Sequence, residues 1–149
     1  MAELVLSVDV DAEPPVVWRA LTDWHRQGEW MIATTVRPTY RDGQGAGGQL
    51  EARTGLGPLA VVDSMTITAW EPPYRCLVRH TGRAIAGAAA FEVAQLPGGR
   101  SRFTWAEWLE LPMGALGQAG FLVVRPLVAA GIRRSLRQFA DWVVRRELG

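Results

Sequence analysis

The sequence predicts an α+β fold, in which a curved antiparallel sheet of seven strands wraps around one long C-terminal helix and two short helices follow the first strand. Two observations lead to this prediction. Strand-like runs follow one another between tight turns, which favours antiparallel pairing, and the helical patterns are segregated from them. The last stretch, residues 115–148, repeats apolar residues at steps of three and four, which places them on one face of a helix. This apolar stripe consists of Phe121, Val124, Val128, Ile132, Leu136, Phe139 and Val143.

Pro126 lies inside this last stretch. Proline removes one backbone donor and crowds the preceding turn, so we expect a kink or a short break near Arg125. An apolar stripe of this length needs a broad surface to cover it, and the predicted sheet supplies that surface.

Length and composition predict one soluble domain over residues 1–149. The 149 residues are 48% hydrophobic and 21% charged, which is ordinary for a globular protein. A net charge of +1 argues against a dedicated nucleic-acid binder. Cys76 is the only cysteine, which excludes an intramolecular disulfide and a cysteine metal cluster. Because the N-terminus lacks a secretory pattern and no run of about 18 uncharged apolar residues occurs, we expect no membrane insertion and a cytoplasmic location.

The N-terminal elements are a strand and two helical pieces. Residues 3–10 alternate, with Leu4, Leu6, Val8 and Val10 on one face, which predicts a half-buried strand. Pro14 and Pro15 fit the first turn of a helix that ends near residue 23, and a second helical piece covers about residues 25–31.

Six further strands follow in hairpin-like succession. We expect them at residues 34–40, 49–54, 59–70, 74–80, 83–95 and 103–111. The glycine-rich segment 42–48 between the first two is not a phosphate loop, since no Lys-Ser/Thr follows it and the next element is a strand. It is interpreted as a turn whose positive φ angles need glycine. The strand at 83–95 offers mostly glycine and alanine, which leaves room on one face of the sheet.

Four stretches carry a resemblance to a known family. They are Asp11-Ala12-Glu13-Pro14-Pro15-Val16-Val17-Trp18, the segment from Trp24 to Met31, Trp70-Glu71-Pro72-Pro73, and the segment from Gly99 to Trp105. In this order and spacing they resemble the START-like helix-grip (SRPBCC) superfamily, and within it the bacterial polyketide cyclase/dehydrase-like group. The resemblance spans nearly the whole chain. It implies seven antiparallel strands that grip the C-terminal helix, with an apolar cavity between sheet and helix.

The expected cavity is lined by aromatic and aliphatic side chains with a few polar ones. We expect the following residues to line it: Trp30, Met31, Arg53, Met65, Ile67, Arg79, Phe91, Trp105, Leu109, Phe121, Val124 and Val128. Arg53 and Arg79 would orient an acidic or enolate-like ligand oxygen if they point inward, although strand arginines more often face water.

Glu107 and His80 are the candidate catalytic residues. In the strand at 103–111, Glu107 shares a face with Phe103, Trp105 and Leu109. A carboxylate among such side chains would be partly desolvated, which raises its pKa and suits it to proton transfer. The alternative is an edge position paired with an arginine. His80 is either a general base or a surface residue at a strand end.

Three functions remain open at this point. The first is binding of a small hydrophobic ligand, which is aromatic, polyketide-like or a lipid, in the internal cavity. The second is a cyclase, aromatase or dehydrase-type enzyme that uses the acid and base residues of that cavity. The third is a protein-interaction module, which should expose a large apolar patch. No cofactor and no metal are expected, since the two histidines lie far apart and no carboxylate stands at ligand spacing.

Overall fold

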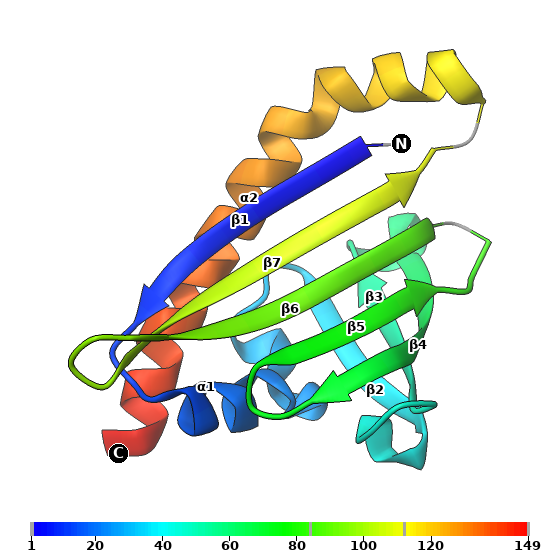
Figure 1. The fold of residues 1–149 in the computed structure, drawn as a ribbon. Coiled ribbons are helices and arrows are strands. Elements are labelled where there is room, and N and C mark those ends of the chain that lie inside the picture. Colours follow the sequence, from blue (N-terminus) through cyan, green and yellow to red (C-terminus); the bar gives the residue numbers. More distant parts are fainter. Residues whose placement is uncertain (1, 84, 112, 149) are drawn as a thin grey trace.

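A computed structural model describes residues 2–83, 85–111 and 113–148. Figure 1 shows a curved sheet with the long helix α2 along one side. The elements in chain order are β1 (Ala2–Val10), α1 (Pro14–Leu21), the 3-10 helix η1 (Trp24–Glu29), β2 (Thr34–Tyr40), η2 (Arg41–Gly43), β3 (Gln49–Thr54), η3 (Gly57–Leu59), β4 (Val61–Glu71), β5 (Arg75–His80), β6 (Ala86–Leu96), β7 (Arg100–Glu110) and α2 (Gly114–Leu148). The predicted fold class and element order are confirmed.

The seven strands form one antiparallel sheet in the order β1-β7-β6-β5-β4-β3-β2. Side chains alternate between its two faces, so each strand contributes every second residue to the concave inner face. On β7 the inner residues include Phe103 and Trp105, which pair with Val93 and Phe91 of β6. All four are buried.

The second half of α2 packs on this inner face. Leu136 and Phe139 are 1% and 0% exposed. The Phe139 ring contacts Phe103 and Trp30 at centroid distances of 5.1 and 4.7 Å. Ser135 Oγ also accepts a hydrogen bond of 3.0 Å from the backbone N–H of Ile32. These contacts anchor the helix between the sheet and the segment that follows η1.

Pro126 bends α2, as one of the two predicted alternatives. The helix continues through Pro126, so the structure has the kink and not the short break, and Figure 1 shows that the first turns run in a different direction from the rest. Proline leaves the carbonyl oxygen four residues earlier, that of Leu122, without its helical donor. Leu122 is 69% exposed, so water can reach this part of the backbone. A bend therefore replaces the break.

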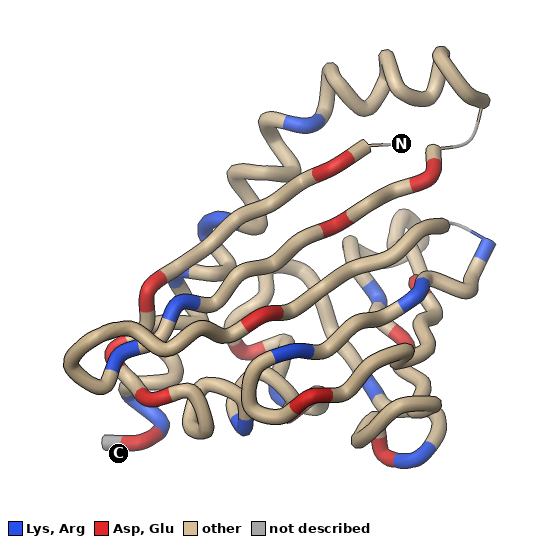
Figure 2. The backbone as a smooth tube through the Cα atoms, viewed as in Figure 1, with Lys and Arg blue, Asp and Glu red and all other residues tan. Residues whose placement is uncertain are grey.

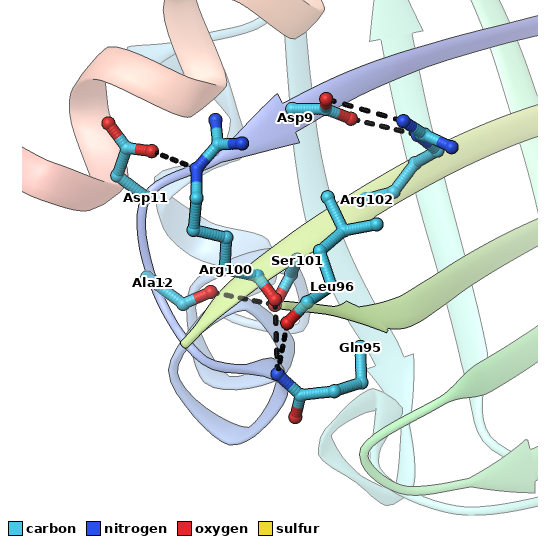
Figure 3. Close-up of polar contacts among 8 residues, drawn as sticks. All are labelled: Asp9, Asp11, Ala12, Gln95, Leu96, Arg100, Ser101 and Arg102. Atoms are coloured by element: carbon cyan, nitrogen blue, oxygen red, sulfur yellow. Dashed lines mark hydrogen bonds and ion pairs between the residues drawn. The ribbon is translucent and has the colours of Figure 1, made fainter. Parts of the chain in front are cut away.

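Polar contacts fix the end of the sheet where β1 leads into α1 (Figure 3). Arg102 donates two hydrogen bonds to the carboxylate of Asp9, at 2.8 and 3.3 Å, and these bonds lower the pKa of Asp9. Ser101 Oγ donates to the carbonyl oxygen of Ala12 at 2.7 Å.

Figure 2 shows that charged residues are scattered over the whole sheet, and α2 carries no charged side chain in its first turns.

The glycine-rich segment after β2 is a turn, as predicted. Gly43, Gly45 and Gly47 have φ angles of 64°, 96° and 87°. At Gly43 a Cβ atom would lie 2.7 Å from the Trp24 indole, whose Nε1 donates to the Gly43 carbonyl oxygen at 2.8 Å. Glycine is thus required here by both backbone conformation and close packing.

Candidate functional site

Three ionisable side chains meet on the inner face, from three different strands. His80, the last residue of β5, lies between Asp63 of β4 and Glu107 of β7. Its Nδ1 is 2.8 Å from Asp63 Oδ1, and its Nε2 is 2.9 Å from Glu107 Oε2. The side chains are 3%, 14% and 13% exposed for His80, Asp63 and Glu107. We call this group the carboxylate–imidazolium cluster.

Small residues on β6 allow this contact across an intervening strand. His80 pairs with Gly87 and Glu107 pairs with Ala89, so neither β6 residue places a large side chain between them. Gly87 has a φ of 115°, and a Cβ atom there would collide with the carbonyl oxygen of Trp108. The small residues Gly87 and Ala89 therefore let an imidazole from β5 reach a carboxylate from β7.

His80 is protonated at neutral pH. A neutral imidazole has one donor and one acceptor nitrogen, so it satisfies one carboxylate and places a lone pair against the other. Burial by itself lowers the pKa of His80, but the hydrogen bonds and negative charges of Asp63 and Glu107 outweigh it and raise the pKa from 6.5 to about 9. Both ring N–H groups then donate to carboxylate oxygens.

Glu107 is less isolated than the sequence suggested. It lies on the inner face with Trp105, as its strand position predicted, but it accepts two hydrogen bonds there. One comes from His80, and the other comes from the indole Nε1 of Trp105 to Oε1 at 3.0 Å. The alternative of an edge position paired with an arginine is wrong, since β7 lies between β1 and β6 and the partners of Glu107 are His80 and Trp105. That Glu107 transfers protons stays a prediction.

The predicted lining residues of the sheet and of η1 mostly lie where expected. Trp30, Met65, Ile67, Phe91 and Trp105 are buried, with exposed fractions of 1%, 8%, 1%, 6% and 6%. Met31 and Leu109 are half-buried. A cavity lined by Phe91 and Trp105 requires that neither is exposed to solvent, and both are buried. That these residues contact a ligand stays a prediction.

The inward orientation expected of Arg53 and Arg79 is wrong. Arg79 pairs with Thr66, one residue away from His80, and so points to the opposite face from His80. Arg53 is exposed and borders a surface pocket of about 250 Å³ together with Arg37 and Glu51. The strict alternation of a strand explains both positions, because each arginine immediately precedes or follows an inner residue.

The predicted lining residues of α2 lie in its poorly covered half. Phe121 is half-buried, and Val124 and Val128 are 46% and 38% exposed. The expectation that all three are buried by the sheet is therefore wrong. Helical periodicity placed them on the same stripe as Phe139, but in this half of α2 the side chains of the stripe are not covered.

Asp63 is the site residue that sequence reasoning missed. Strand alternation places Asp63 on the same face as Met65 and Ile67. A carboxylate on an otherwise apolar face of a strand could have indicated a site residue. The alternative surface position for His80 is wrong, because the residue is 7% exposed and lies between carboxylates of the neighbouring strand β4 and of β7. Within residues 2–83, 85–111 and 113–148, no group of three His, Cys, Asp or Glu side chains is arranged to hold a metal ion. Burial raises the pKa of the Cys76 thiol to about 12, which leaves it unreactive.

The first half of α2 exposes a broad apolar surface. Leu116, Leu122, Val123 and Leu127 are 65%, 69%, 80% and 76% exposed. An 18-residue window within this helix has a mean hydropathy of 1.5, which is apolar enough by length and composition to cross a bilayer, and none of the window is buried. One such helix is weak evidence for a span, and the absence of membrane insertion stays a prediction. The surface is the feature that the protein-interaction hypothesis requires.

Comparisons with known proteins give a family and a shared fold. The model of a family described as polyketide cyclase / dehydrase and lipid transport matches residues 1–143. The protein TTHA0849 from Thermus thermophilus is similar in structure, with a TM-score of 0.81 at 14% identity, over 97% of this chain and 99% of that one. The Zhui aromatase/cyclase from Streptomyces sp. R1128 has a TM-score of 0.74 at 14% identity, over 97% of this chain and 94% of that one. These TM-scores establish a shared fold. No curated protein sequence matches the chain.

Proposed function

This chain belongs to the polyketide cyclase/dehydrase and lipid transport family, and from this premise we propose that it binds a small hydrophobic ligand, aromatic or polyketide-like, between the inner face of the sheet and α2. The sequence resemblance to this group is confirmed. The observation that carries the proposal is the carboxylate–imidazolium cluster, a charged group set into an otherwise apolar face. Ligand sites combine apolar walls with a few polar groups in this way.

The apolar part of the proposed site consists of aromatic side chains beside the cluster. Trp105 contacts Phe91 at a centroid distance of 4.9 Å and Trp30 at 6.5 Å, both edge to face. Flat ligands stack favourably against such rings. The proposal includes a cytoplasmic location and no bound cofactor.

Native mass spectrometry of the protein purified from its own cells tests this proposal. We expect a mass excess from a small organic molecule that denaturation releases. The Trp105→Ala variant should lose it, while Trp108→Ala, on the outer face of the same strand, should keep it. A ligand-free protein that also fails to bind 2-naphthol in equilibrium dialysis would contradict the proposal.

A second candidate is an acid–base enzyme of the cyclase or dehydrase type. It is favoured by the pairing of a proton donor, His80, with carboxylate acceptors in one cluster. In an aldol-type ring closure, a carboxylate would take the proton from the carbon next to one carbonyl group. The imidazolium would protonate the oxygen of the other carbonyl group only after one of its two carboxylate hydrogen bonds has been exchanged for that oxygen. Glu107→Gln should then abolish turnover and leave binding nearly unchanged, whereas a carrier should keep its function in this variant.

A further inference from the structure

The carboxylate–imidazolium cluster has no hydrogen-bond donor left for a ligand. Both N–H groups of His80 are used by Asp63 and Glu107, and both oxygens of Glu107 already accept a bond. The oxygen Oδ2 of Asp63 receives no hydrogen bond from the described residues. A carboxylate oxygen has two lone pairs, so the cluster offers acceptors only. With two carboxylates around one imidazolium, it also presents an excess of negative charge.

The indole of Trp30 supplies the complementary group. Its Nε1 is the one buried side-chain polar atom in the described part of the chain that lacks a hydrogen-bond partner, and the residue is 1% exposed. A buried N–H without an acceptor is unfavourable, so this position calls for one. Trp30 lies edge to face against Trp105, and the Trp105 N–H donates to Glu107. The Trp105 side chain therefore contacts both the ring of Trp30 and the cluster.

From this arrangement we infer that the site selects a neutral aromatic ligand, whose hydroxyl group donates to the carboxylate of Asp63 and whose carbonyl oxygen accepts from Trp30. We infer also that the site rejects carboxylate anions such as free acids. This inference rests on the proposed function and narrows its ligand class. A phenolic or enolic hydroxyl satisfies the free lone pairs of Asp63. A carboxylate ligand at the same position faces like charge in a partly desolvated site and finds no donor there.

Equilibrium dialysis with three probes at pH 7 tests the inference. The probes are 2-naphthol, 2-naphthoate and 2-methylnaphthalene, which share one apolar ring system and differ in the polar group. We expect 2-naphthol to bind at least tenfold more tightly than 2-naphthoate and more tightly than 2-methylnaphthalene. The Asp63→Asn variant should reduce the preference for 2-naphthol over 2-naphthoate to about threefold or less. Glu92→Gln removes the same charge from the outer face of β6 and should leave the preference unchanged.

A fourth probe examines the Trp30 end. A 6-acetyl group on 2-naphthol should tighten binding to the wild type, and Trp30→Phe should remove that gain while binding of 2-naphthol itself changes little. The preference of the wild type for 2-naphthol over 2-naphthoate tests the selectivity against carboxylate anions even if a variant fails to fold. Equal binding of 2-naphthol and 2-naphthoate would overturn the inference and leave the proposed function standing. Binding of none of the four probes would remove the proposed function and the inference with it.

Discussion

The two halves of α2 differ sharply, although one helical periodicity runs through both. In the second half, Leu136 and Phe139 are 1% and 0% exposed, and the Phe139 ring packs against aromatic side chains of the sheet and of the segment that follows η1. In the first half, Leu122 and Leu127 are 69% and 76% exposed. Figure 1 shows that α2 begins at the end of the sheet where β7 ends, which is also the end that carries Glu107.

This difference separates the parts of the molecule that hold the fold from those available for binding. The covered end of the inner face consists of close-packed aromatic rings. The other end carries the carboxylate–imidazolium cluster. The first half of α2 begins at that end, and its apolar side chains are exposed and not packed in the core. We therefore expect substitutions at the first end to change stability, and substitutions at the second end to change ligand binding and pH dependence.

The largest effect is expected for Phe139→Ala. The ring is fully buried between Phe103 and Trp30, so its removal leaves a cavity that should cost about 3–5 kcal/mol of unfolding free energy. The matched control, Leu127→Ala in the exposed half, should change stability by about 0.5 kcal/mol or less. Urea unfolding of both variants checks this. Equal losses at the two positions would show that the halves do not differ as described.

Raising the pH should lower the free energy of unfolding through the carboxylate–imidazolium cluster. The pKa of His80 rises from 6.5 to about 9 on folding, so between these values the folded chain keeps a proton that the unfolded chain has released. Stability from this residue is complete below pH 6.5 and is lost as the pH rises through about 9, by up to about 3 kcal/mol. Urea unfolding from about pH 6 to about pH 10 measures it. The His80→Gln variant should lack this slope, and a wild-type curve without it would argue against the ion pairs.

A pair of glycine substitutions should have effects of opposite sign. Gly87→Ala forces a side chain onto the Trp108 carbonyl oxygen at a φ of 115°, which should cost about 1–3 kcal/mol. Gly120→Ala, in the exposed half of α2 where nothing lies within 4 Å of the new methyl group, should stabilise by up to about 1 kcal/mol. Thermal unfolding followed by circular dichroism compares the two. If Gly87→Ala left the thermal stability unchanged, the close approach of Gly87 to the Trp108 carbonyl oxygen would not explain why glycine occupies this position of β6.

The sequence was sufficient for the elements and for the alternation within each strand. Period-two patterns placed Trp105, Phe91 and Glu107 on one face, and the turn glycines marked the hairpins. It was not sufficient for contacts across strands, since these depend on register: the pairing of Asp63 with His80 joins residues seventeen positions apart, and Glu107 reaches His80 over an intervening strand. Nor does periodicity reveal which part of a helix is covered, which is why Val124 was expected to line the cavity although it is 46% exposed.

The protonation state of His80 tests the central claim most directly. Nitrogen-15 NMR of the two histidine side chains from about pH 5 to about pH 11, with His80→Gln to assign the signals against exposed His25, reports each ring nitrogen separately. The account predicts that both His80 nitrogens carry a proton at pH 7 and that the ring loses one near pH 9. A neutral His80 ring at pH 7, with titration near 6.5, would contradict the carboxylate–imidazolium cluster and the ligand selectivity drawn from it.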